Sequence, residues 1–156
     1  MANYNDRNAE HVERLSIFEL YTHFFALEIS QIREVIPLPA YTPLPNSNRT
    51  YIGVFNLRGE IYPLADISPL LGFPNKEIYP DDMVVLIDSG EMVVGFIVDK
   101  IYGMIHINPS EIKLPRGLVP HSMEKYIAGV VEHQRKQYFI LDVSTLFKSH
   151  ELLAFI

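Results

Sequence analysis

Short stretches of alternating apolar and polar residues recur along the chain, with the two-residue period of half-buried strands. The stretch FFALEI (24–29) turns most of its large apolar side chains to one face, and YFILDV (138–143) has the composition of another strand. In MVVLIDSGEMVVGFIV (83–98), two β-branched runs flank a turn at Gly90, which predicts a hairpin because glycine supplies the positive φ of tight turns. The pattern therefore predicts a mainly β protein.

Helix signals are few and short. DISPLLG predicts one helical turn, with Ser68 as its N-cap and Gly72 as its terminator. A similar start at Ser144 has no breaker behind it, and its apolar stripe predicts a C-terminal helix over 144–156 that packs on the body. The proline-rich stretch PLPAYTPLP (37–45) favours a structured connection, with a proline-rich recognition ligand as the alternative.

The two helix starts belong to an internal repeat. GVFNLRGEIYPLADISPLL, from Gly53, aligns with GVVEHQRKQYFILDVSTLF, from Gly129, at an offset of 76, and six of nineteen positions coincide. A weaker match, at an offset of 69, places ISQIREVIPL over VDKIYGMIHI. Two copies, each too small to bury a core alone, are expected to pack together as small barrels or closed sheets. The loop-like stretch GFPNKEIYPDD separates approximate sub-barrels at 15–75 and 83–147, and strands are allowed to cross between them.

Composition narrows the possible functions. The 156 residues are 48% hydrophobic, which suits one compact unit or two very small ones. The net charge is −6 and no basic cluster exceeds two residues, which argues against nucleic-acid binding. Cysteine is absent, so no disulfide framework, thiolate nucleophile or cysteine metal site is present. Residues 1–14 predict a flexible or weakly helical tail, and without a long apolar run we expect a cytoplasmic protein with no direct membrane insertion.

Candidate catalytic groups are sparse. The chain has none of the common nucleotide-binding, nucleophile-elbow or zinc-protease motifs, and its six histidines are scattered. Asp66 and Asp142 occupy matching places in the repeat and would suit an acid–base couple. The favoured interpretation is that each accepts backbone N–H bonds at a helix start. We therefore expect no catalytic residues, no metal and no cofactor.

The turn NLRGE between two apolar runs carries a lone cation, Arg58. On composition alone a solvated turn residue is favoured, with Gly59 taking the unusual dihedral angles of the turn. The matching turn of the second copy, EHQRKQ, is uniformly polar, whereas the first keeps Leu57 beside the arginine. Apolar area next to an arginine is typical of interface hot spots, so a contact surface is the second interpretation.

At these residues the sequence resembles a known family. YIGVFNLRGEIYPLADISPLLGF looks like the signature of the CheW-like domain, the family of bacterial chemotaxis coupling proteins, and the resemblance covers about 15–150. It implies two packed SH3-like five-stranded β-barrels, with a few short helices. It also implies a stand-alone, non-catalytic adaptor in a two-component system. Its partners would be the regulatory domain of a chemotaxis histidine kinase and the cytoplasmic tip of methyl-accepting chemoreceptors.

The resemblance also implies where partners bind. The expected partner-binding residues are Arg58, Gly53, Glu34, Ile32 and Gly95 by family position, with Val35 and Phe55 as neighbouring exposed apolar residues. Arg58 and Glu34 would set register and partner choice, and the apolar side chains would supply affinity. Glu60 departs from the usual apolar residue and is expected to pair with or screen Arg58.

Two alternatives remain open. One is an adaptor of the same kind in a chemosensory pathway that does not control flagella. The other is a small-ligand or hydrolytic module that uses a His/Asp cluster between the barrels, which would require a histidine within about 4 Å of a carboxylate in a pocket.

Overall fold

The computed structural model describes residues 13–45 and 49–154. Its strands are β1 (Glu13–Leu20), β2 (His23–Glu28), β3 (Ile32–Pro37), β4 (Thr42–Pro43), β5 (Tyr51–Leu57), β6 (Glu60–Ala65), β7 (Met83–Asp88), β8 (Val93–Val98), β9 (Lys100–Ile107), β10 (Ile127–His133) and β11 (Lys136–Leu141). Its short helices are η1 (Ile29–Gln31), η2 (Ser68–Leu71), η3 (Pro109–Glu111), η4 (Glu124–Tyr126), α2 (Val143–Phe147) and α3 (His150–Leu153). The predicted tail lies outside the described residues, except that Glu13 and Arg14 already belong to β1.

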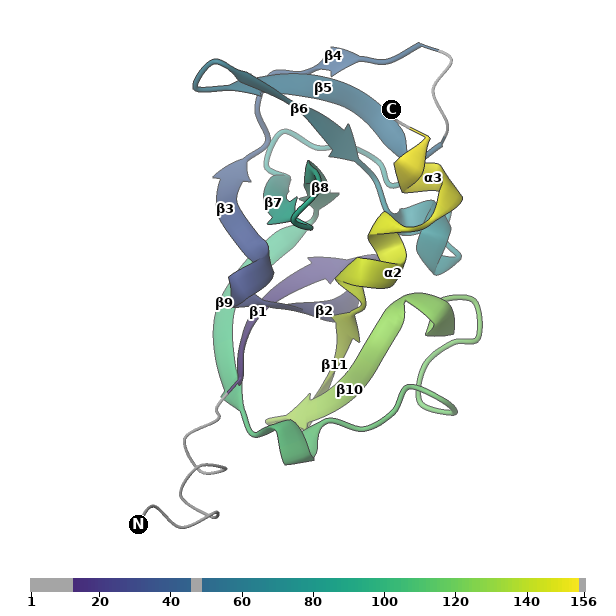
Figure 1. The fold of residues 1–156 in the computed structure, drawn as a ribbon. Coiled ribbons are helices and arrows are strands. Elements are labelled where there is room, and N and C mark those ends of the chain that lie inside the picture. Colours follow the sequence, from purple (N-terminus) through teal and green to yellow (C-terminus); the bar gives the residue numbers. More distant parts are fainter. Residues whose placement is uncertain (1–12, 46–48, 155–156) are drawn as a thin grey trace.

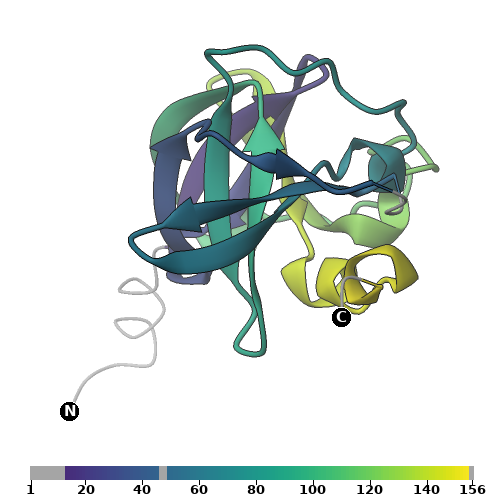
Figure 2. The ribbon, with the colours of Figure 1, turned by 90° about the horizontal axis from the view of Figure 1, so that it is seen from above.

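These strands form two sheets that stack one above the other in Figure 1. One has five strands in the order β10-β11-β2-β1-β9, and the other has six in the order β3-β7-β8-β6-β5-β4. Figure 2 shows the six-stranded sheet curling round, with the C-terminal helices beside it. We call the two units the five-stranded and the six-stranded barrel. The predicted mainly β fold of two packed barrels is confirmed, and the two-residue β4 adds the sixth strand.

Each barrel takes one hairpin from the other copy of the repeat. The β1–β2 hairpin joins the sheet of β9, β10 and β11, and the β7–β8 hairpin joins that of β3 to β6. Each exchanged hairpin pairs on both sides, in parallel for β2 with β11 and β8 with β6, and antiparallel for β1 with β9 and β7 with β3. The limits 15–75 and 83–147 therefore describe the copies of the repeat and not the strands of each sheet.

The repeat itself is confirmed by the strand pairing. The β5–β6 and β10–β11 hairpins have the same length and register and both close with two-residue turns. Arg58 and Gly59 have φ of 51° and 89°, and Gln134 and Arg135 have φ of 50° and 66°. Positive φ at both central positions is typical of a type I′ turn, whose twist matches that of the strands. The expected left-handed conformation of Gly59 is therefore confirmed.

The largest apolar cluster lies between the two barrels rather than inside either one. It combines residues of both sheets and the helices, including Phe18, Phe25, Leu71, Phe96 and Phe147. The interior of the five-stranded barrel holds a smaller set around Leu15 and Val131, and that of the six-stranded barrel a set around Phe55 and Leu64. The barrels depend on each other for burial, as expected for copies too small to fold alone.

Aspartate side chains, and not serine side chains, accept the backbone hydrogen bonds at the starts of η2 and α2. The Asp66 carboxylate accepts a bond from the backbone N–H of Ser68 at 3.0 Å. Asp142 is the N-cap of α2 and accepts from the N–H of Thr145 at 3.0 Å, so the predicted cap Ser144 lies inside the helix. The cap assignment to the serines was wrong, because both serines lie inside their helices and the aspartates accept from the free N–H groups. The interpretation of both aspartates as helix-start acceptors is confirmed.

The C-terminal segment forms two short helices instead of the single one expected over 144–156. The chain bends at Ser149, whose hydroxyl accepts from the N–H of Leu152 at 3.3 Å and so begins α3. The hydroxyl of Tyr51 donates to the carbonyl of Leu152 at 2.6 Å and ties α3 to β5. No helix in the described part of the chain has the length and apolar character needed to cross a membrane.

Buried ion pairs hold the connection 73–82 between the copies. The Nζ of Lys76, whose side chain is 3% exposed, lies 2.6 Å from Asp82 and 3.2 Å from Asp99. The other oxygen of Asp99 accepts from the backbone N–H of Tyr21 at 3.0 Å. The network joins the connection, the β1–β2 turn and the corner between β8 and β9.

Candidate functional site

Strand β3 forms an edge of the six-stranded sheet, where it pairs with β7. In the part of the chain that the structure describes, no backbone ladder joins this edge to the tip of the β5–β6 hairpin, at the upper left of Figure 1. Side chains span the gap instead. We call them the seam cluster, which consists of Arg33, Glu34, Arg58, Glu60, Tyr62 and Asp88.

Two of the predicted partner-binding residues meet in this cluster. Arg58 donates from both terminal nitrogens to the two carboxylate oxygens of Glu34, with 2.9 Å between Nη1 and Oε2. The side chain of Arg58 is 69% exposed and that of Glu34 is 29% exposed. The planar fork of arginine matches a carboxylate in this bidentate arrangement. We expected both residues at one surface from the sequence, and the structure places them in direct contact.

A second set of contacts lies beside this pair. Arg33 donates to Asp88 at 2.7 Å and to the hydroxyl of Tyr62 at 3.5 Å. That hydroxyl in turn donates to Glu60 at 2.7 Å. Glu60 therefore bonds Tyr62 and not Arg58, and screening of Arg58 by Glu60 stays a prediction. The Glu60 carboxylate accepts instead from Tyr62, which lies two residues along on the same face of β6.

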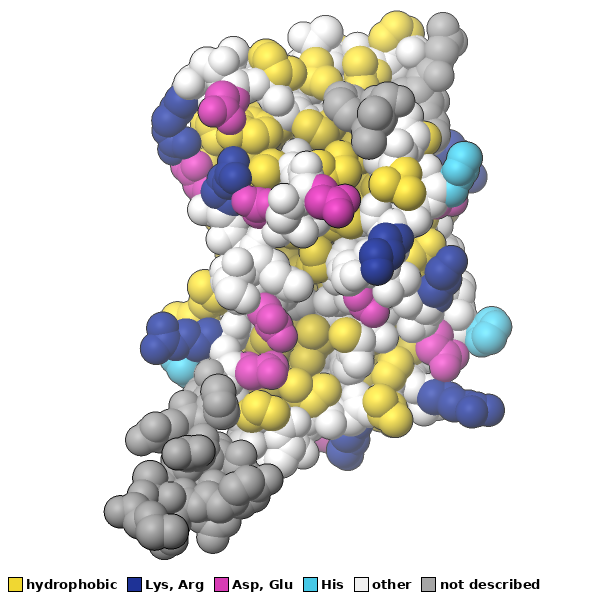
Figure 3. All heavy atoms as spheres, viewed as in Figure 1, with side chains coloured by type: hydrophobic (Ala, Val, Ile, Leu, Met, Phe, Trp, Pro, Cys, Tyr) yellow, Lys and Arg dark blue, Asp and Glu magenta, His cyan; other side chains and the backbone are white. Residues whose placement is uncertain are grey.

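A β-bulge brings consecutive residues of β3 to the seam. The register against β7 shifts between Ile32 and Glu34, so Arg33 is the extra residue of the pair. Arg33 and Glu34 therefore both reach the hairpin, although neighbours in a regular strand point to opposite faces. Figure 3 shows the result as basic and acidic side chains side by side at the upper left of the molecule, with apolar side chains between them.

The ion pairs shift the titration of their members. Hydrogen bonds from Arg58 hold the pKa of Glu34 below its ordinary value, and Glu34 raises the pKa of Arg58. The backbone N–H of Gly90, and then Arg33, lower the pKa of Asp88. Both carboxylates are thus charged at neutral pH, and the cluster presents fixed charges of both signs.

We predict that the Glu34 carboxyl titrates below the ordinary glutamate pKa of about 4.3 in NMR experiments. Because the folded-state pKa is lowered, the stability contributed by the pair is present above the unfolded-state pKa and is lost as pH falls through the folded value. In Arg58→Gln the pKa should return to its ordinary range, whereas Arg135→Gln in the matching turn should leave it unchanged. A Glu34 pKa that is the same in wild type and Arg58→Gln would contradict the pairing in solution.

Apolar side chains flank the seam cluster. Val35 is 36% exposed and Ile61, at the start of β6, is 63% exposed. Ile32 is only partly buried but packs against the cluster between the barrels. The expected exposure of Val35 agrees with the structure. Ile61 is a further exposed apolar residue at this surface that was not among the residues expected from the sequence.

The other three predicted residues are buried, and a contact of each with a partner stays a prediction. Phe55 is 2% exposed, so the expectation that it offers an exposed apolar surface was wrong. A Cβ on Gly53 would lie 2.6 Å from the carbonyl oxygen of Thr42, where β4 pairs antiparallel with β5. A Cβ on Gly95 would lie 2.7 Å from Val84 and 3.0 Å from Phe55. Both glycines are needed for close approach, and Phe55 faces the interior because strand side chains alternate between faces.

A second exposed apolar surface lies on the five-stranded barrel, in the connection between η3 and η4. Leu114 is 80% exposed and Leu118 is 40% exposed. The exposed cations Lys113 and Arg116 lie beside them in the chain. This surface could not be predicted from the sequence, because a Leu-Pro-Arg-Gly-Leu loop has no periodicity that separates exposed leucines from buried ones.

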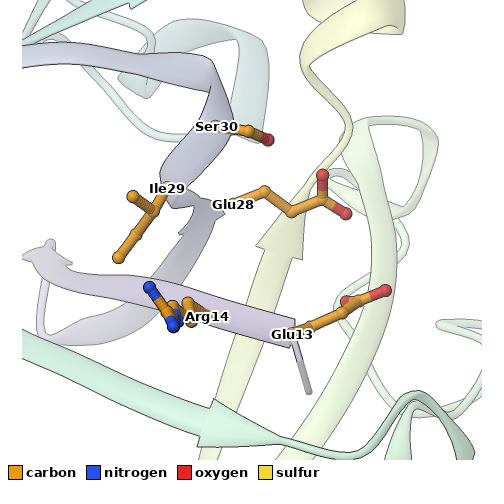
Figure 4. A pocket seen from close by; sticks show the side chains of 5 residues that line it. All are labelled: Glu13, Arg14, Glu28, Ile29 and Ser30. Carbon is orange, nitrogen blue, oxygen red and sulfur yellow. The ribbon is translucent and has the colours of Figure 1, made fainter. Parts of the chain in front are cut away.

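A hydrolytic centre finds little support in the described residues. The hollow between the start of β1 and the end of β2 is lined by Glu13, Arg14, Glu28, Ile29 and Ser30, without a histidine (Figure 4). Burial, and then Glu28, raise the pKa of Glu13 there. Among the ion pairs of the described residues, the one that includes a histidine joins His121 to Glu124 at 3.5 Å, with the imidazole fully exposed. No group of three potential metal ligands occurs in the same residues.

Comparisons with known proteins agree with this architecture. The family described as "CheW-like domain" matches residues 14–151. The chemotaxis protein CheW of Thermotoga maritima is 28% identical over 131 residues, which cover 84% of this chain and 85% of that protein. Protein PilI of Pseudomonas aeruginosa is 25% identical over 118 residues, or 76% of this chain and 66% of PilI. The crystal structure of the scaffolding protein TtCheW from Thermoanaerobacter tengcongensis superposes with a TM-score of 0.80 at 23% identity, covering 90% of this chain and 96% of that one. The chain therefore belongs to the CheW-like domain family.

Proposed function

We propose that this protein is a non-catalytic adaptor that couples chemoreceptors to a chemotaxis-type histidine kinase in a receptor array. The observation that carries the proposal is the bidentate Arg58–Glu34 pair, exposed at the seam beside Val35 and Ile61. Charged groups beside exposed apolar area suit a protein interface, where the apolar part supplies affinity and the charges supply register. The chemotaxis relatives and the scaffolding protein of the same fold support a role of this kind.

An adaptor needs two surfaces that can be occupied at once. The seam cluster lies on the six-stranded barrel, and the Leu114–Leu118 surface lies on the five-stranded barrel. In the proposed mechanism one surface holds the barrel-like regulatory domain of the kinase and the other holds the helical tip of a receptor. A change in the receptor then alters the kinase through the fixed geometry of the two barrels, which share one apolar cluster.

We predict that Arg58→Glu weakens binding to at least one of the two partners about tenfold or more, the usual size for an interface hot spot. The substitution breaks the bidentate pair and sets a carboxylate against Glu34. Binding of the kinase regulatory domain and of a receptor tip fragment is measured by calorimetry. The side chain is mostly exposed, so the melting temperature should stay within a few degrees.

The matched control is Arg135→Glu, which makes the same charge change in the type I′ turn of the other barrel. It should leave binding at the seam cluster intact. Unchanged affinity of Arg58→Glu for both partners would remove the role assigned to Arg58. Failure of the wild-type protein to bind either partner would reject the adaptor function itself.

A second candidate is an adaptor of the same kind in a chemosensory pathway that does not control flagella. The match to PilI, which is named differently from the chemotaxis relatives, favours keeping it. Two experiments separate the candidates. One identifies the kinase that co-purifies with the protein from its native cell, and the other tests whether deleting the gene for this protein abolishes swimming.

A further inference from the structure

Phe55 stands between a buried glycine and the seam cluster. On one side its ring edge fills the space over Gly95, where a Cβ would lie 3.0 Å from the ring. On the other side its ring centroid is 5.9 Å from that of Tyr62. Tyr62 then donates to Glu60 and accepts from Arg33, as described above. A continuous line of contacts thus leads from the barrel interior to the charged surface.

The five-stranded barrel fills the same place differently. By the repeat offsets and the parallel pairing, Gly95 corresponds to Ala26 and Phe55 corresponds to Val131. Both Ala26 and Val131 are buried in the interior of that barrel. One barrel thus combines glycine with phenylalanine, and the other combines alanine with valine. Closed packing can therefore be reached without a phenylalanine at this position, and Phe55 can meet a local demand as well as fill the space over Gly95.

That demand is found at the seam. The tyrosine that corresponds to Tyr62 is Tyr138, whose ring packs against Phe24 with centroids 5.7 Å apart. The residue of β8 that corresponds to Phe24 is Val93, which offers no ring. In the six-stranded barrel the aromatic contact of Tyr62 therefore comes from Phe55, its partner across the β5–β6 hairpin.

We propose that Phe55, seated over Gly95, is a positioning residue that holds the ring of Tyr62 and thereby fixes Arg33 and Glu60 in the seam cluster. Because Arg33 and Glu34 are consecutive at the bulge of β3, the same support orients the Arg58–Glu34 pair. The part of this inference that concerns partner binding rests on the proposed function. The part that concerns Tyr62 and Arg33 is a property of the free protein.

The test compares two variants. Gly95→Ala pushes the phenylalanine ring, since the new methyl group would lie too close to Phe55 and Val84. Gly95→Ala/Phe55→Val reproduces the pair found in the other barrel, so it should recover most of the stability lost by Gly95→Ala. It also removes the ring under Tyr62. A positioning role predicts that the NMR signals of the Arg33 guanidinium, which contacts Tyr62 and not Phe55, shift in both variants, even where the melting temperature has recovered.

Partner binding gives the second readout. Affinity for the partner that Arg58→Glu loses should fall about three- to tenfold in both variants. Ala26→Gly, at the corresponding position of the five-stranded barrel, is the control and should leave the Tyr62 and Arg33 signals and the affinity unchanged. The inference is overturned if the Arg33 signals stay at their wild-type positions in the double variant, or if they return together with stability. The NMR readout needs no partner, so it decides the inference even if the wild-type protein binds neither.

Discussion

Asp82→Ala is expected to lower the free energy of unfolding by about 3–5 kcal/mol. The Nζ of Lys76 is buried with its side chain 3% exposed, and Asp82 is its closest carboxylate at 2.6 Å. Removing that carboxylate leaves a buried ammonium with Asp99 at 3.2 Å as its remaining acidic partner. It also removes the acceptor of the backbone N–H of Tyr79. Urea unfolding followed by circular dichroism measures the change.

The neighbouring carboxylate supplies the control. Asp81 is exposed, and Asp81→Ala should change stability by no more than about 0.5 kcal/mol. Replacing both charges, in Lys76→Met/Asp82→Leu, should recover most of the loss, because a buried ion pair is often no more stable than apolar residues of similar size. If Asp82→Ala costs no more than Asp81→Ala, the network does not hold the connection in solution.

Phe96→Ala is expected to cost about 3–5 kcal/mol and to weaken both barrels together. The side chain is fully buried in the cluster between the barrels and stacks on Phe147, with centroids 5.8 Å apart. Its strand, β8, belongs to the six-stranded sheet, but its ring faces the shared cluster. Amide hydrogen exchange in β5 and β10 reports on the two barrels separately, and both should lose protection by the same free energy.

Tyr102→Ala provides the comparison, since Tyr102 is an aromatic residue of similar size that is 53% exposed. Tyr102→Ala should lower the free energy of unfolding by well under half as much as Phe96→Ala does. Loss of protection in β5 alone would show that the two barrels unfold independently and that the shared cluster does not couple them.

The repeat made much of this fold predictable from sequence. Hairpins, their two-residue turns and the mainly β class follow from local patterns such as the alternation in 24–29 and the glycine after Arg58. The exchange of hairpins between barrels does not follow from local patterns, because it depends on which strands of one copy pair with which strands of the other. The break at Ser149 was missed because the apolar stripe of the C-terminal segment continues past it.

For the candidate site, the residue types were informative and their partners were not. Arg58 and Glu34 were placed at one surface through the family resemblance, but the preference of Glu60 for Tyr62 depends on side-chain direction along β6. Arg33 and Asp88 are 55 positions apart, and the bulge that brings Arg33 to the seam has no glycine to mark it. Phe55 was placed on the surface because an apolar residue near a turn looks alike whether it faces the partner or the core.

The exchanged hairpins also determine the order in which the protein can fold as it is synthesised. When β6 leaves the ribosome, neither barrel has its full set of strands, because β6 still lacks its parallel neighbour β8 and β2 still lacks β11. The six-stranded sheet is complete once residue 98 has emerged, and the five-stranded sheet only after residue 141. The first copy can form its β1–β2 and β5–β6 hairpins early, but β2 lacks its parallel neighbour β11 until late in translation. A chain truncated after 71 should accordingly be a client of chaperones rather than a folded half-protein.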